Sequence, residues 1–173
     1  MRINGYKIRE ALKLWNNKRE ATLSLFEGSL TKFKDEEKKS PDDVMSDFLE
    51  AEAAIAELQT EQMRYNLEVN IRVNGNSMTL AEAIKKIGGV GRVEKAWKAA
   101  SKPIVKGRYG GVESKVLSSK NADTEYAERV VSFEEALAKA EAAGREAATL
   151  REAIAVGNGR EVDSGLSPEL LGG

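Results

Sequence analysis

The clearest pattern in the chain is a run of mostly apolar positions between Ser40 and Tyr65 that recur at steps of three and four. This spacing places them on one stripe of a helix. Ser40 is a natural N-cap and Pro41 suits the first helical position, so the helix is predicted to begin there. The stripe consists of Val44, Phe48, Ala51, Ile55, Leu58, Gln62 and Tyr65.

A similar pattern precedes this helix and predicts another one, from about Gly5 to the charged run at 34–39. A short turn joins the two helices, so residues 5–65 are predicted to form an antiparallel helical hairpin. The apolar positions expected on the inner side of the first helix are Ile8, Leu12, Trp15, Leu23, Phe26, Leu30 and Phe33.

After Tyr65 the apolar residues alternate with polar ones, which is the period of a β-strand. Asn74-Gly75 follows and favours a tight turn, so residues 66–78 are predicted to form a β-ribbon. The competing interpretation is that the helix continues to about Asn74. Because a two-stranded ribbon alone is marginal, it must pack on the helices or pair with another subunit. The candidate contacts are Leu67, Val69, Ile71 and Val73.

Two capping boxes mark the starts of later helices, one at Thr79–Glu82 and one at Ser132–Glu135. They predict helices over 79–101 and 132–156. Three glycines fall inside the first of them, where either the helix breaks or another backbone comes very close. These candidate oligomer contacts are Gly88, Gly89 and Gly91.

Residues 102–131 lack a regular pattern and are predicted to form an irregular basic, Gly-rich region, in which residues 112–117 could add a short strand. Residues 161–173 are predicted to be a tail that only an external contact would order. The whole pattern predicts a mainly all-α fold, an elongated antiparallel helical bundle or coiled coil with a small β-ribbon insertion, in a single domain over 1–160. Composition agrees, since 32% of the 173 residues are charged, 41% are apolar and only three are proline.

Charge is unevenly distributed along the chain. Residues 85–120 carry ten Lys or Arg against two acids, whereas the helix from Ser40 to Met63 carries seven acids and no base, so a partner is expected to face it. The two stretches could neutralise each other within one chain or between neighbouring chains. Alternatively, basic and aromatic side chains together could bind nucleic acid. The candidate patch is Lys85, Arg92, Lys95, Trp97, Lys98, Lys102, Arg108 and Tyr109.

The chain has neither Cys nor His, which excludes thiol nucleophiles, imidazole bases, structural zinc sites and disulfides. No pattern indicates a catalytic residue, a cofactor site or a metal site, so we expect a protein without enzymatic activity. No apolar run reaches the roughly 20 residues of a spanning helix, and no signal peptide is evident. A cytoplasmic location, or one within an assembled particle, is therefore expected.

Three places in the sequence resemble the septicolysin-like family of small bacterial helical proteins. They are Ile8-Arg9-Glu10-Ala11-Leu12, then Asn66-Leu67 with Met78-Thr79-Leu80-Ala81-Glu82-Ala83-Ile84, and finally Arg108-Tyr109. The likeness covers about residues 5 to 160 and departs from the family at Gly88–Gly91 and over 106–132. It implies a helical, self-associating protein and transfers no active site.

These observations predict a structural or interaction protein that forms a homo-oligomer, as a component of a larger particle such as a phage or a cytoplasmic assembly. Two alternatives remain. One is a membrane-active, cytolysin-like protein, with residues 26–33 as the best candidate segment. The other is a nucleic-acid-binding protein that uses residues 85–120.

Overall fold

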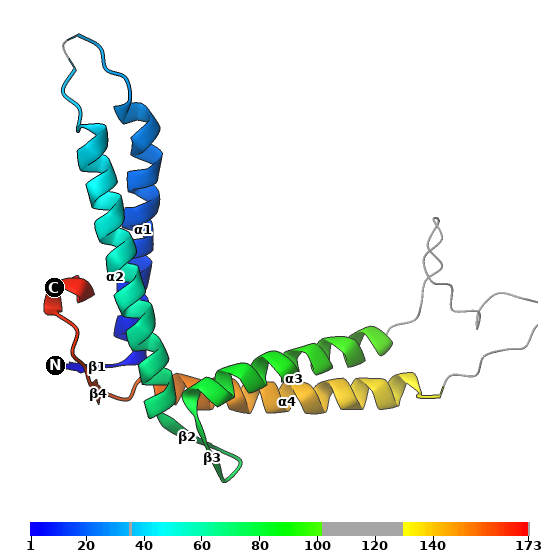
Figure 1. Cartoon of the computed structure of the whole chain (residues 1–173). Coiled ribbons are helices and arrows are strands. Elements are labelled where there is room, and N and C mark those ends of the chain that lie inside the picture. Colours follow the sequence, from blue (N-terminus) through cyan, green and yellow to red (C-terminus); the bar gives the residue numbers. More distant parts are fainter. Residues whose placement is uncertain (35, 102–129, 173) are drawn as a thin grey trace, which may run out of the picture. The chain divides into compact units, whose positions relative to one another are not determined.

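The computed structural model describes residues 1–34, 36–101 and 130–172. The fold is mainly helical with a small β insertion, which confirms the predicted class (Figure 1). Its elements are β1 (Arg2–Ile3), α1 (Gly5–Ser29), α2 (Pro41–Glu68), β2 (Asn70–Val73), β3 (Asn76–Thr79), α3 (Leu80–Ala100), α4 (Phe133–Asn158), β4 (Val162–Asp163) and a 3-10 turn, η2 (Pro168–Leu171).

The contacts group the chain into two compact units, where the sequence predicts one domain over 1–160. The first unit contains residues 1–83 and 152–173, and the second contains residues 84–151. No helix in the described parts of the chain has a stretch long and apolar enough to cross a bilayer.

The first unit is built on the hairpin of α1 and α2, which pack along their length (Figure 1). The Ser40 side chain accepts a hydrogen bond from the Asp43 amide at 3.1 Å, which confirms the predicted start of α2. The predicted stripe is also confirmed. Its members Val44, Ala51, Ile55, Leu58 and Tyr65 are buried.

The predicted end of the first helix is wrong, because α1 stops at Ser29 instead of reaching 34–39. The Lys38 ammonium donates to the carbonyl oxygens of Gly28 and Thr31, which satisfies two acceptors that a longer helix would have used. Three of the apolar residues expected on the inner side of this helix are exposed instead. They are Leu23, Leu30 and Phe33, and the exposed fraction of Phe33 is 83%.

The ribbon of β2 and β3 is confirmed, with Asn74 and Gly75 in its turn at φ of 51° and 83°. Its start differs from the prediction. The last helical hydrogen bond of α2 runs from the Val69 amide to the Tyr65 carbonyl, so Leu67 belongs to the helix. Neither interpretation at this point is complete, since the helix extends three residues past Tyr65 before the strand begins.

Residues 161–172 are ordered by their own chain, which corrects the predicted external contact. β4 pairs antiparallel with β1, and the Met1 amine donates to the Ser164 carbonyl at 2.9 Å. Further along, the Trp15 indole N–H donates to the Leu170 carbonyl at 2.9 Å.

Several segments of the first unit meet around Tyr65, which is fully buried. Two glycines allow the close approach. A Cβ on Gly5 would lie 2.9 Å from the Tyr65 ring, and one on Gly157 would lie 2.7 Å from Ile71 Cγ2. These backbones could not come so close with larger residues.

The second unit pairs α3 with α4 through a narrow seam of small side chains. The α4 residues buried there are Ala136, Ala140, Ala143, Ala147 and Leu150. The larger Phe133 and Leu137 of the same helix are 42% and 49% exposed. Each alanine buries one methyl group, about 0.8 kcal/mol of transfer free energy, so this seam stabilises the unit weakly.

The predicted capping box at Thr79–Glu82 is present with both of its bonds, and the one at Ser132–Glu135 is present in its N-cap bond. The Glu82 amide donates to Thr79 Oγ1 at 3.1 Å while Glu82 Oε2 accepts from the Thr79 amide at 2.7 Å. At the start of α4, the Glu135 amide donates to Ser132 Oγ at 3.0 Å.

Candidate interaction surfaces

The most extensive exposed apolar feature of α2 is a second stripe on the side opposite its buried one. Its large members are well exposed, by 61% for Leu49, 60% for Met63 and 65% for Leu67. Between them lie small exposed residues, and Met45 at one end is half-buried. The outer stripe consists of Met45, Leu49, Ala53, Ala56, Thr60, Met63 and Leu67.

The outer stripe follows helical spacing as regularly as the buried one. Its steps are four, four, three, four, three and four, and such steps keep side chains on one face over the whole of α2. An apolar face of this length on an exposed helix is typical of a surface that contacts another helix. Sequence reasoning missed it, although the same step counting that found the buried stripe would have found this one.

The acidic side chains of α2 are partly neutralised within the chain, which corrects the expectation that a partner must supply the countercharge. The Lys18 ammonium lies 2.9 Å from Glu50, and the Arg19 guanidinium lies 3.4 Å from Glu52. Lys39 pairs with Asp47, which raises the pKa of the lysine. The first helix and the turn after it therefore provide cations for α2, although residues 40–63 themselves contain no Lys or Arg.

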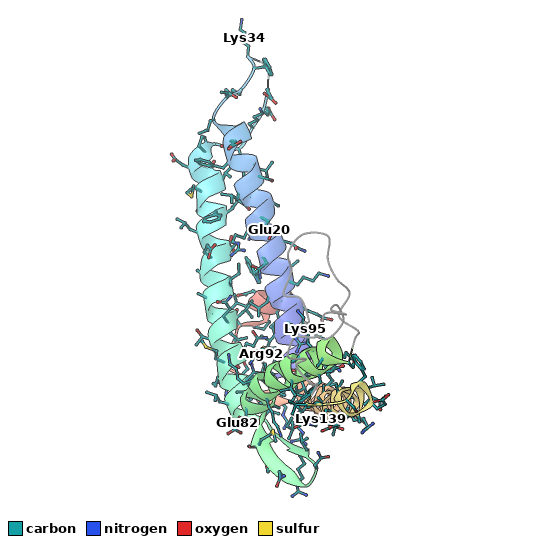
Figure 2. The ribbon with its side chains drawn as sticks, turned by 90° about the vertical axis from the view of Figure 1, so that its right-hand side faces the viewer. Glu20, Lys34, Glu82, Arg92, Lys95 and Lys139 are labelled. Carbon is teal, nitrogen blue, oxygen red and sulfur yellow. The ribbon has the colours of Figure 1, made fainter. Side chains whose placement is uncertain are left out.

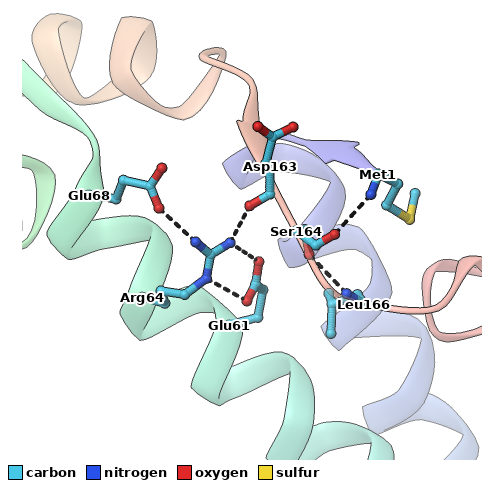
Figure 3. Close-up of polar contacts among 7 residues, drawn as sticks. All are labelled: Met1, Glu61, Arg64, Glu68, Asp163, Ser164 and Leu166. Atoms are coloured by element: carbon cyan, nitrogen blue, oxygen red, sulfur yellow. Dashed lines mark hydrogen bonds and ion pairs between the residues drawn. The ribbon is translucent and has the colours of Figure 1, made fainter.

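At the other end of α2, Arg64 connects the helix to the C-terminal segment (Figure 3). Its guanidinium donates to both carboxylate oxygens of Glu61, at 2.6 and 2.9 Å, and to Glu68 at 2.7 Å. It also donates to the carbonyl oxygen of Asp163. The hydrogen bonds from Arg64 hold the pKa of the buried Glu61 carboxyl below its ordinary value.

The ribbon residues predicted to contact another subunit are mostly covered by their own chain. Val69, Ile71 and Val73 are buried, with exposed fractions of 4%, 2% and 3%. The ribbon packs on its own unit, so these side chains are not an open apolar edge. Leu67 is the exposed member of that set, and it lies on the outer stripe of α2.

The three glycines of α3 fit neither of the two predicted situations. The helix runs unbroken from Leu80 to Ala100, and a Cβ on Gly89 or Gly91 would meet nothing within 4 Å. A Cβ on Gly88 would meet only the end of the Arg92 side chain, at 3.8 Å. Within the described residues, therefore, no other backbone approaches them, and their role as oligomer contacts stays a prediction.

The basic residues of α3 divide into paired and unpaired groups. Lys98 lies 2.6 Å from Glu94, and the Trp97 ring stacks against the ammonium of Lys139 from α4, 4.6 Å from the ring centroid. In contrast, Lys85, Arg92 and Lys95 are exposed and form no ion pair among the described residues; Figure 2 shows two of them on α3. The other predicted members of the patch, Lys102, Arg108 and Tyr109, lie outside the described residues, as does the strand predicted at 112–117.

A hollow of about 460 Å³ lies at the loop end of the α1–α2 hairpin, lined by residues that include Leu25, Gly28 and Val44. The two lysines at its edge already bond within the chain, Lys38 to backbone carbonyls and Lys39 to Asp47. Across 1–34, 36–101 and 130–172, no group of three or more acidic side chains is placed to hold a metal ion.

No protein-family model, no curated protein and no solved structure matches this chain. The resemblance to the septicolysin-like family therefore stays a prediction that rests on the quoted residues alone.

Proposed function

We propose that this chain is a self-assembling structural protein without catalytic activity, which forms a homo-oligomer in the cytoplasm or within a larger particle such as a phage. The observation that supports this proposal is the pair of opposite apolar stripes on α2. One stripe packs against α1, while Leu49, Met63 and Leu67 of the other stripe remain more than half exposed. Burying such a face against a further helix is favourable, because apolar surface leaves water.

The narrow alanine seam of the second unit supports the same proposal. Leu137 and Val93 are each 49% exposed there, on helices whose mutual contact buries mainly methyl groups. Two helices joined in this way gain stability when further helices cover them, as in helical bundles.

The test is the molar mass of charge variants on the outer stripe, measured by light scattering. We expect Leu49→Glu and Met63→Glu to lower the mass towards the 18.9 kDa of one chain, because a carboxylate in an apolar contact is costly. Val156→Glu is the matched control, since Val156 is also 60% exposed but lies on α4. Equal masses for all three variants and the unmodified chain would argue against the proposal.

Nucleic-acid binding is a second candidate function, supported by the cations of α3 that form no ion pair within the described residues. Lys85, Arg92 and Lys95 share the exposed side of that helix with small residues at Gly88 and Ala99, which leave room for a phosphate backbone. Binding to mixed-sequence double-stranded DNA should weaken steeply with salt, and less steeply once the three cations are replaced by Gln. Absence of binding at low salt would remove this candidate.

A membrane-active, cytolysin-like function is supported by the exposed residues after α1. Leu30 and Phe33 are 59% and 83% exposed near Lys34, at the end of the α1–α2 hairpin (Figure 2). Apolar and basic side chains together favour a lipid surface. Leakage of anionic lipid vesicles that disappears in Phe33→Ser would support this function, and vesicles that stay sealed with the unmodified chain would remove it.

A further inference from the structure

The outer stripe of α2 has almost the same order of residue sizes in both directions. Counting outward from Ala56, the large residues Leu49 and Met63 lie seven positions away on either side. Met45 and Leu67 lie eleven positions away, again on either side. The small residues Ala53 and Thr60 lie near the middle.

We propose that two copies of the chain associate through this stripe, with their α2 helices antiparallel and a two-fold axis beside Ala56. This inference rests on the proposed self-assembly and specifies the surface that carries it. A two-fold contact requires a self-complementary surface, in which each residue meets its counterpart on the reversed chain. In this register Leu49 meets Met63 of the other copy, and Met45 meets Leu67.

Residue size suits this pairing at the axis and at the two outer pairs. Ala56 meets its own counterpart, which allows the two helices to approach closely there. Ala53 and Thr60 lie three and four positions from Ala56, so in this register they lie opposite Gln59 and Glu52 of the other copy. The large side chains towards both ends extend across to the other helix. The residues of the outer stripe recur on average at close to 3.7 positions, about one helical turn, which keeps the contact on one face of nearly straight helices.

The size of the face indicates a small contact. The outer stripe extends over 23 residues, from Met45 to Leu67, whose 22 steps of 1.5 Å give about 33 Å of helix. Two faces of this length and about 10 Å width cover roughly 660 Å², below the roughly 1,000 Å² of a standard specific interface, so we expect an association that is reversible at micromolar concentrations.

Charge favours the antiparallel orientation over the parallel one. The N-terminal half of α2 carries five acids and no base, whereas the C-terminal half carries three acids and one base, Arg64. Parallel helices would bring the two acidic halves together. Antiparallel helices place the more acidic half of each copy beside the less acidic half of the other, so the repulsion between the two helices is smaller.

Single cysteines test the orientation directly, because the chain has no cysteine of its own. Under mild oxidation, Ala56→Cys should form a disulfide-linked dimer by itself, since the two thiols lie beside the axis. Leu49→Cys and Met63→Cys should each stay unlinked when alone and form a mixed dimer when combined. Val156→Cys, which is exposed on α4, is the control that measures disulfide formation by random collision. Ala56→Cys alone, and Leu49→Cys mixed with Met63→Cys, should form disulfides at least about tenfold faster than this control.

Each result has one consequence. Efficient linking of Leu49→Cys or Met63→Cys to itself would indicate parallel helices and overturn the proposal. If the unmodified chain has a mass that is a multiple of 18.9 kDa but the paired cysteines link no faster than Val156→Cys, this interface is wrong and self-assembly still holds. A mass of one chain for the unmodified protein would overturn both. Circular dichroism of each variant verifies that the helices are retained.

Discussion

The hydroxyl group of Tyr65 donates to the carbonyl oxygen of Gly157 at 2.7 Å, although the two residues are 92 positions apart in the sequence. The same hydroxyl lies 2.9 Å from the Arg160 carbonyl, and burial raises its pKa. This contact attaches the C-terminal end of α2 to the end of α4.

Replacing Tyr65 by Phe should destabilise the chain by about 1–3 kcal/mol, because the buried carbonyl of Gly157 loses its donor. The measurement is the free energy of unfolding by urea. Tyr6→Phe is a matched control, since its hydroxyl also bonds to a carbonyl, that of Ala155, but at an exposed position. An equal effect of the two replacements would contradict the structural role of Tyr65.

Adding one methyl group should have opposite effects at two glycines. Gly157→Ala should destabilise by about 1–3 kcal/mol, because its Cβ would lie 2.7 Å from Ile71 and 3.1 Å from Leu80. Gly89→Ala should instead stabilise by roughly 0.5–1 kcal/mol, since its Cβ enters open space within a helix. Urea unfolding measures both. Destabilisation by Gly89→Ala would mean that another chain packs closely there, as the sequence had suggested.

Acid should weaken the attachment of the C-terminal segment through Glu61. The folded chain lowers the pKa of this carboxyl from 4.5, chiefly through its hydrogen bonds with Arg64. Its contribution is therefore complete above about pH 4.5 and is lost as the pH falls through the lower folded-state value. Urea unfolding at a series of pH values should show a steeper acid loss for the unmodified chain than for Glu61→Gln. Parallel pH profiles of the two proteins would exclude this role.

The sequence predicted the features that depend on neighbouring residues. The caps at Ser40 and Ser132, the capping box at Thr79–Glu82 and the Asn74–Gly75 turn are local patterns, and each is present. The buried stripe of α2 was predictable for the same reason, because helical spacing places its members together. These features needed no information about distant parts of the chain.

The features that sequence reasoning missed depend on distant contacts. Strands β1 and β4 have two residues each, too few to show alternation, so their pairing left no pattern to detect. Burial of Val69, Ile71 and Val73 depends on their own unit covering the ribbon, with Gly157 against Ile71. The early end of α1 depends on Lys38 folding back to the carbonyl of Gly28, which helical spacing does not reveal.

Removing the charge of Glu57 should strengthen the proposed antiparallel contact. In that register the two Glu57 carboxylates flank the axis, one position from Ala56, and like charges repel. We expect Glu57→Gln to tighten association about two- to fivefold, the size of a surface charge effect. Glu20→Gln on α1 is the control, and sedimentation velocity measures both. Weaker association of Glu57→Gln than of Glu20→Gln would contradict the register.

The central claim is that the chain associates with copies of itself, and its molar mass in solution tests this most directly. Sedimentation equilibrium of the unmodified protein over a range of micromolar concentrations should give a mass of at least two chains, decreasing towards 18.9 kDa only on dilution. A mass of 18.9 kDa at every concentration would contradict the claim, because the outer stripe of α2 would then remain uncovered.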